Sequence, residues 1–162
     1  MSTLVLRDAR DSRGALLHWK VGRGAQTDLG SFGDPIRGTA VLLCLYDSAD
    51  SPQPVFHAVV PPGGTCDARP CWKLREGRGY RYRNRAGTDD GVMVLKLRTS
   101  AAGEAQLLVK GRGAKLAVPA RDLSLPVLVQ LVADDVNATT CWSAVFENAS
   151  RNDGGQFRAS SP

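Results

Sequence analysis

Four cysteines are the side chains of this 162-residue chain with the clearest covalent chemistry. An even number of cysteines favours disulfide bonds. We favour the pairing of Cys66 with Cys71, which closes a small loop, and of Cys44 with Cys141, which links two interior strands. The pairs Cys44–Cys66 and Cys71–Cys141 stay open as an alternative, as does a buried free thiol at Cys44. Two disulfides would indicate an oxidising compartment.

Metal binding and catalysis have little support in the sequence. The cysteines lack the close ligand pairs at both ends that structural zinc sites use. We interpret the acidic pair Asp89 and Asp90 as part of a turn, because calcium needs about six to eight oxygen ligands. The two histidines, His18 and His57, stand in no nucleophile or metal-ligand motif. The sequence therefore predicts a protein that is not an enzyme and has no catalytic residues, no cofactor and no metal site.

The densest basic stretch spans residues 73–85 and has the chemistry of an anion-binding surface. In the strand expected at 79–84, aromatic and arginine side chains alternate, so the arginines share one face. The residues that we expect to contact a polyanion are Lys73, Arg75, Arg78, Arg81, Arg83 and Arg85. Their guanidinium and ammonium groups bind phosphate and carboxylate, which makes an acidic polysaccharide or another polyanion the candidate ligand. The simpler interpretation is a solvated arginine face over a buried tyrosine face.

Three tryptophans offer flat rings on which sugars could stack. Trp72 and Trp142 each follow a cysteine directly, and in β-sandwiches such a tryptophan usually packs on a disulfide in the core. We therefore expect these two to be buried. Trp19, which lies between His18 and Lys20, is expected to be the exposed one.

The overall composition limits the class of protein. The chain has 21 basic and 16 acidic residues, a net charge of +5, which is far below the charge density of a dedicated nucleic-acid-binding protein. No apolar run approaches the roughly 20 residues of a transmembrane helix. The first residues, Met1 to Asp8, lack a basic segment followed by an apolar one, so we identify no signal peptide in this chain.

Short apolar runs separated by turn residues predict an all-β protein with almost no helix. The expected strands cover about 3–8, 15–21, 38–46, 54–60, 71–75, 79–84, 91–98, 104–110, 126–133 and 140–147. About ten short antiparallel strands at this spacing are typical of a β-sandwich or a flattened barrel.

The same pattern predicts one domain and two less regular segments. Residues 1–147 are expected to form a single β-sandwich domain. Residues 22–37, with few apolar side chains, are expected to form a long exposed loop. Residues 148–162 are expected to be a polar C-terminal tail in which only Phe157 could dock.

A series of motifs gives the chain a likeness to a known group of proteins. In order, the motifs include Cys44-Leu45-Tyr46-Asp47, Gly63-Gly64-Thr65-Cys66, Pro70-Cys71-Trp72-Lys73 and Cys141-Trp142. Together they resemble an uncharacterised β-rich domain, often C-terminal, of exported bacterial proteins. The resemblance covers nearly the whole chain and is weakest over residues 9–37. It implies an extracellular, cell-surface or periplasmic location and carries no known activity.

Two functional hypotheses follow from these observations. The first is an exported, non-catalytic structural or surface-interaction module that associates with itself through edge strands. The alternative is a module that binds a glycan or another polyanion through residues 73–85.

Overall fold

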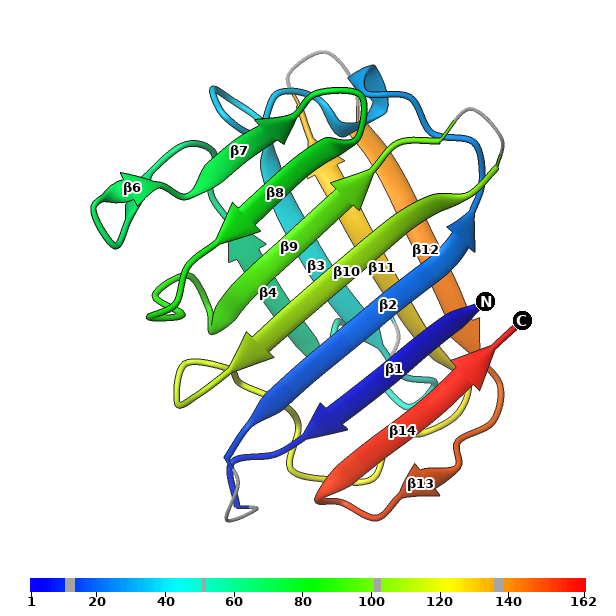
Figure 1. The fold of residues 1–162 in the computed structure, drawn as a ribbon. Coiled ribbons are helices and arrows are strands. Elements are labelled where there is room, and N and C mark those ends of the chain that lie inside the picture. The colour runs from blue at the N-terminus through cyan, green and yellow to red at the C-terminus, as the bar shows by residue number, and fades with distance from the viewer. Residues whose placement is uncertain (11–13, 51, 101–102, 136–138) are drawn as a thin grey trace.

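The computed structural model describes residues 1–10, 14–50, 52–100, 103–135 and 139–162, which fold into two facing antiparallel β-sheets (Figure 1). The larger sheet has eight strands in the order β13-β14-β1-β2-β10-β9-β8-β7. In that order their bounds are Arg151–Asn152, Gln156–Ser161, Ser2–Arg7, Leu16–Gly24, Ala105–Arg112, Val92–Arg98, Gly79–Arg83 and Trp72–Arg75.

The smaller sheet has four strands in the order β12-β11-β3-β4. Their bounds are Thr139–Phe146, Val127–Asp134, Ala40–Tyr46 and Phe56–Val60. A two-stranded hairpin, β5 (Thr65–Cys66) and β6 (Arg69–Pro70), projects beside β7 (Figure 1). The described residues contain no α-helix and one 3-10 turn, η1 (Gly30–Phe32). The predicted all-β antiparallel sandwich is confirmed, with 14 strands in place of about ten.

Alternation of buried and exposed side chains explains how the two sheets enclose the core. In β11, Val127, Val129 and Leu131 are buried, while Leu128 and Gln130 are partly exposed. Successive side chains of a strand point to opposite faces, so each strand sends every second residue between the sheets. The largest fully buried side chains are Trp19, Phe32, Trp72, Tyr82 and Phe146.

Trp19 is buried in this core, so the prediction that it is exposed is wrong. Its side chain has 0% exposure, and its Nε1 donates a hydrogen bond of 2.9 Å to Ser2 Oγ. The physical reason is the position of β2 in the sheet. That strand lies between β1 and β10 and is therefore an interior strand, and residue 19 is on the side that faces the smaller sheet.

The C-terminal residues form part of the larger sheet, so the prediction of a polar tail at 148–162 is wrong. β14 pairs with β1 over six residues, from Ser2 opposite Ser161 to Arg7 opposite Gln156. Phe157 is 3% exposed, because it faces the core from an interior strand. Figure 1 shows the two chain ends side by side on these two strands. The fold thus extends beyond the boundary expected at residue 147.

The segment 22–37 is only partly the exposed loop that we predicted. β2 continues to Gly24, and Thr27 forms an isolated β-bridge with Ser100. Phe32 has 0% exposure, and its ring centroid lies 5.0 Å from that of Trp142. One aromatic side chain in a polar segment is enough to anchor the segment over the core.

The cysteines form one disulfide, between Cys66 and Cys71, as predicted. Cys44 and Cys141 are free thiols, so the second predicted pair is not formed. In the smaller sheet they lie on β3 and β12, with β11 between them. Two strand spacings amount to roughly 10 Å, which exceeds the limit of about 7 Å between the Cα atoms of a disulfide.

Candidate polyanion-binding face

Strand register gathers basic side chains on the outer face of the larger sheet. Lys73 pairs with Arg81, and Arg81 pairs with Lys96 on the next strand. Lys96 pairs with Leu108, which in turn pairs with Lys20. This row crosses β7, β8, β9, β10 and β2, and its members lie about 4.8 Å apart because that is the spacing of strands in a sheet.

We call the outer side of these five strands the basic face. A parallel row places Arg83, Val94, Lys110 and His18 across β8, β9, β10 and β2. The charged or titratable residues of the basic face are His18, Lys20, Lys73, Arg75, Arg81, Arg83, Lys96, Arg98, Lys110 and Arg112. None of the five strands contains Asp or Glu.

The like charges of the basic face are close enough to affect one another. Partial burial lowers the pKa of Lys96, and the nearby Arg81, Arg98 and Lys110 lower it further. Burial also lowers the pKa of His18, with smaller effects from Lys110 and Lys20. Both shifts run in the direction expected of cations that crowd without a carboxylate between them.

All six basic residues predicted from the sequence lie on or beside this face. Lys73, Arg75, Arg81 and Arg83 point outward from β7 and β8. Arg78 lies in the β7–β8 turn, and Arg85 follows β8. They line two adjoining hollows of the surface.

More than half of the basic face was missed by sequence reasoning. Lys20, Lys96, Arg98 and Lys110 come from three strands that are far from residues 73–85 in the chain, yet they line one groove together with His18. Each strand contributes only one or two cations. Alternation could have placed Lys96 on the outer side of β9, but only the register shows which residues lie beside it.

A cleft of about 280 Å³ lies at the β7–β8 end of the basic face, and we call it the arginine pocket. Its charged lining residues are Asp67, Arg69, Lys73, Arg75, Arg81, Arg83 and Arg85. One carboxylate therefore stands against six cationic side chains in this cleft. Such an excess of cations favours a ligand with several negative charges.

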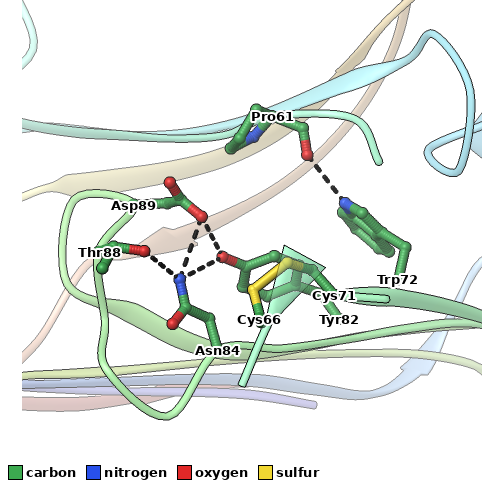
Figure 2. Close-up of a disulfide and its surroundings, with 8 residues drawn as sticks. All are labelled: Pro61, Cys66, Cys71, Trp72, Tyr82, Asn84, Thr88 and Asp89. Atoms are coloured by element: carbon green, nitrogen blue, oxygen red, sulfur yellow. Dashed lines mark hydrogen bonds between the residues drawn. A yellow bond between two sulfur atoms is a disulfide. The ribbon is translucent and has the colours of Figure 1, made fainter. Parts of the chain in front are cut away.

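The disulfide and a buried tryptophan hold the wall of the arginine pocket (Figure 2). Cys66 and Cys71 join the β5–β6 hairpin to the start of β7. Next to Cys71, the Trp72 Nε1 donates a hydrogen bond of 2.9 Å to the carbonyl oxygen of Pro61. The Trp72 ring packs against Tyr82, with 5.2 Å between ring centroids. Trp72 is therefore part of the core, as we expected.

A hydrogen-bonded network beneath the face fixes β8 (Figure 2). The Tyr82 hydroxyl donates a 2.5 Å hydrogen bond to Asp89 Oδ2. The Asn84 Nδ2 lies 3.0 Å from the Tyr82 hydroxyl and 2.6 Å from Thr88 Oγ1. Burial raises the pKa of Tyr82, and the hydrogen bond to Asp89 raises it further, so the phenol stays neutral as a donor. Asp89 thus supports the strand that carries Arg81 and Arg83.

Substitution of Tyr82 tests whether this network stabilises the fold. Tyr82→Phe removes the donor to Asp89 and leaves buried polar groups without their partner, which is expected to lower the free energy of unfolding by about 1–3 kcal/mol. Tyr80→Phe is the matched control, because the Tyr80 hydroxyl makes no hydrogen bond within the described residues. Urea denaturation would measure both variants, and equal losses in both would contradict the role of the network.

The outer face of the smaller sheet carries apolar side chains where the basic face carries cations. Its outward positions include Leu42, Leu128 and Val132, which are half-buried, and Val59 and Val145, which are exposed. The cations of the sandwich are therefore concentrated on one sheet. Among the described residues there is no group of three or more His, Cys, Asp or Glu that could hold a metal ion, and no helix long and apolar enough to cross a membrane.

The chain matches no protein-family model, no curated protein and no solved structure. Its resemblance to an exported bacterial β-rich domain therefore stays a prediction. The function has to be argued from the residues of this chain and their arrangement.

Proposed function

We propose that the protein is a non-catalytic module that binds a linear polyanion along the basic face. The observation that carries the proposal is that five adjacent strands all carry cations on their outer side and contain no carboxylate. The ion pairs formed within the described residues use Arg10, Arg37, Arg121 and Arg151, none of which belongs to this face. The cations of the basic face thus have no acidic partner among those pairs and are available to an anionic ligand.

The shape of the basic face favours a polymer over a small molecule. Five strands at a spacing of about 4.8 Å make a face roughly 20 Å wide, and outward residues along one strand recur every 6–7 Å or so. A polymer with regularly spaced anionic groups can contact several of these cations at once. Many weak electrostatic contacts together give substantial affinity.

The lack of aromatic platforms on this face favours an acidic polysaccharide or a polyphosphate as the ligand. Proteins that bind single-stranded nucleic acids usually stack bases on exposed aromatic rings. Here Trp19, Trp72 and Tyr82 are at most 2% exposed and lie on the inner side of the sheet. Trp142 is half-buried and lies on the smaller sheet, against Phe32.

Self-association through edge strands, our first hypothesis, has less support than polyanion binding. The edge strand β7 carries Lys73 and Arg75, and the edge strand β13 has only two residues. On β4, the backbone N–H of Val59 donates a hydrogen bond to the Asp90 carboxylate. Charged, short or occupied edges disfavour edge-to-edge pairing at these three strands. The fourth edge strand, β12, has eight residues and no charge, so it is the edge at which self-association would occur.

An oxidising compartment is part of the proposal. The Cys66–Cys71 disulfide supports an extracellular, cell-surface or periplasmic location, because disulfides persist mainly in such environments. Acidic polysaccharides at cell surfaces would then be accessible to the basic face.

Two triple variants with the same net charge test the proposed function. Lys20→Gln, Lys96→Gln and Lys110→Gln remove three cations from the basic face, whereas Arg37→Gln, Lys115→Gln and Arg151→Gln remove three from elsewhere. Binding of heparin and of long-chain inorganic polyphosphate is measured by fluorescence titration near physiological salt. We expect the first variant to bind at least about tenfold more weakly and the second to change by less than about threefold. Equal losses, or wild-type protein that binds neither polymer, would overturn the proposal.

A further inference from the structure

The arginine pocket differs from the rest of the basic face because its cations come from several directions. Lys73 and Arg81 project from the paired strands β7 and β8. Arg85 follows β8 along the chain, and Arg69 belongs to the β5–β6 hairpin, opposite Cys66. An anion that enters this cleft is therefore surrounded by cations, whereas a polymer lying on the flat part of the sheet meets them on one side only.

A buried donor without a partner points to a ligand in this pocket. Arg81 is half-buried, and its Nε is buried with no hydrogen-bond partner within the described part of the chain. A buried polar group that lacks a partner is uncommon and costs about 1–3 kcal/mol. Lys73 and Lys96 flank Arg81 on the adjacent strands and are cations, and the one carboxylate of the pocket, Asp67, does not accept a hydrogen bond from this Nε. An oxyanion would supply the missing acceptor.

The pocket is held in place before any ligand arrives. The Cys66–Cys71 disulfide, drawn in Figure 2, fastens the hairpin. A 3.1 Å hydrogen bond from the Cys71 N–H to the Gly64 carbonyl holds the same segment. A further hydrogen bond of 2.9 Å joins the Arg83 N–H to the Cys71 carbonyl, so β8 is tied to the same wall. Little ordering of the wall is then needed on binding, which favours affinity.

We propose that the arginine pocket is a subsite for one tetrahedral oxyanion, a phosphate or sulfate group carried by the polymer. The inference rests on the proposed polyanion-binding function and adds the chemical class of the group that is recognised. A terminal phosphate group offers up to two charges and three acceptor oxygens, and a sulfate ester offers one charge and three oxygens, whereas a carboxylate offers one charge and two oxygens. Six cations from several directions, against the single carboxylate of Asp67, match the group with more acceptor oxygens.

Binding of small anions distinguishes a subsite in the arginine pocket from general binding along the basic face. The probes are pyrophosphate, a sulfated heparin disaccharide and glucuronate, titrated calorimetrically at low salt into the intact oxidised protein. We expect pyrophosphate or the sulfated disaccharide to bind, and glucuronate to bind at least about tenfold more weakly. Preference for pyrophosphate would identify phosphate as the group, and preference for the disaccharide would identify sulfate.

Two single variants with the same charge change locate the binding. Arg81→Gln is expected to lower the affinity for the preferred small anion by about tenfold or more, because a charged hydrogen bond is lost. Lys110→Gln, on the same face but outside the arginine pocket, is expected to change that affinity by less than about twofold. Arg83→Gln repeats the test at an exposed position of the pocket, in case Arg81→Gln perturbs the fold.

The outcomes for the subsite and for the proposed function are distinguishable. If Lys110→Gln weakens small anions as much as Arg81→Gln and Arg83→Gln do, or if glucuronate binds as well as the others, the subsite is wrong. Binding of heparin or polyphosphate to the same protein would still support the proposed function in that case. Selective small-anion binding without polymer binding would support the subsite and overturn the proposed function.

Discussion

Removal of residues 148–162 is expected to abolish folding. These residues supply β14, which forms six residue pairs with β1 and buries Phe157 and Ala159 against the core. The deletion would leave β1 as an unpaired edge and expose the apolar side chains that Phe157 covers. Single domains are stable by only about 5–15 kcal/mol, so the loss of an interior strand exceeds what this fold can tolerate. Near-ultraviolet circular dichroism and urea denaturation would report the loss of tertiary structure.

Point variants in β14 give the same prediction in graded form. Phe157→Ala is expected to lower the free energy of unfolding by about 3–5 kcal/mol, the usual cost of deleting a buried aromatic ring. Arg158→Ala, at the neighbouring outward position, is expected to cost less than about 0.5 kcal/mol. A truncated protein that still unfolds cooperatively with wild-type stability would refute the assignment of this segment to the sheet.

Affinity for a linear polyphosphate is expected to fall about 10³-fold between 50 and 200 mM salt, if at least six cations contact the polymer. Each contact releases counterions from the polymer, so the logarithm of the affinity falls linearly with the logarithm of the salt concentration. The row Lys73, Arg81, Lys96 and Lys20, together with Arg83 and Lys110, supplies six cations on one face. Titrations at a series of salt concentrations would measure the slope.

The two triple variants test whether the salt dependence of binding comes from the cations of the basic face. Loss of Lys20, Lys96 and Lys110 is expected to reduce the slope by roughly two to three, because each lost contact removes about 0.7–0.9 from it. Loss of Arg37, Lys115 and Arg151 is expected to leave the slope unchanged. Affinity that does not depend on salt would exclude an electrostatic mode of binding.

Local features of the sequence were sufficient for much of the architecture. The alternation of Tyr80 and Tyr82 with Arg81 and Arg83 predicts a strand with a basic side, and that is the arrangement in β8. The close spacing of Cys66 and Cys71 predicts the disulfide that is formed. Such features require knowledge of a few neighbouring residues only, because side-chain direction in a strand alternates with a period of two.

The predictions from the sequence were wrong where burial or cysteine pairing depended on the order of strands in a sheet. Trp19 stands between His18 and Lys20, and whether it is buried depends on β2 having a neighbour on each side. Phe157 stands in a polar segment, and its burial follows from pairing with β1. Cys44 and Cys141 cannot pair, because β11 separates their strands. The residues adjacent to these positions in the chain do not determine any of these features.

The sequence by itself therefore determined the class of fold and the basic side of residues 79–84, and it favoured the disulfide at 66–71. Only the tertiary structure decided that the cations of β7 and β8 continue into Lys96, Lys110 and Lys20 as one face. The reason is that alternation is a property of one strand, whereas register and strand order depend on the packing of strands from distant parts of the chain. A binding face that crosses five strands is a property of that packing.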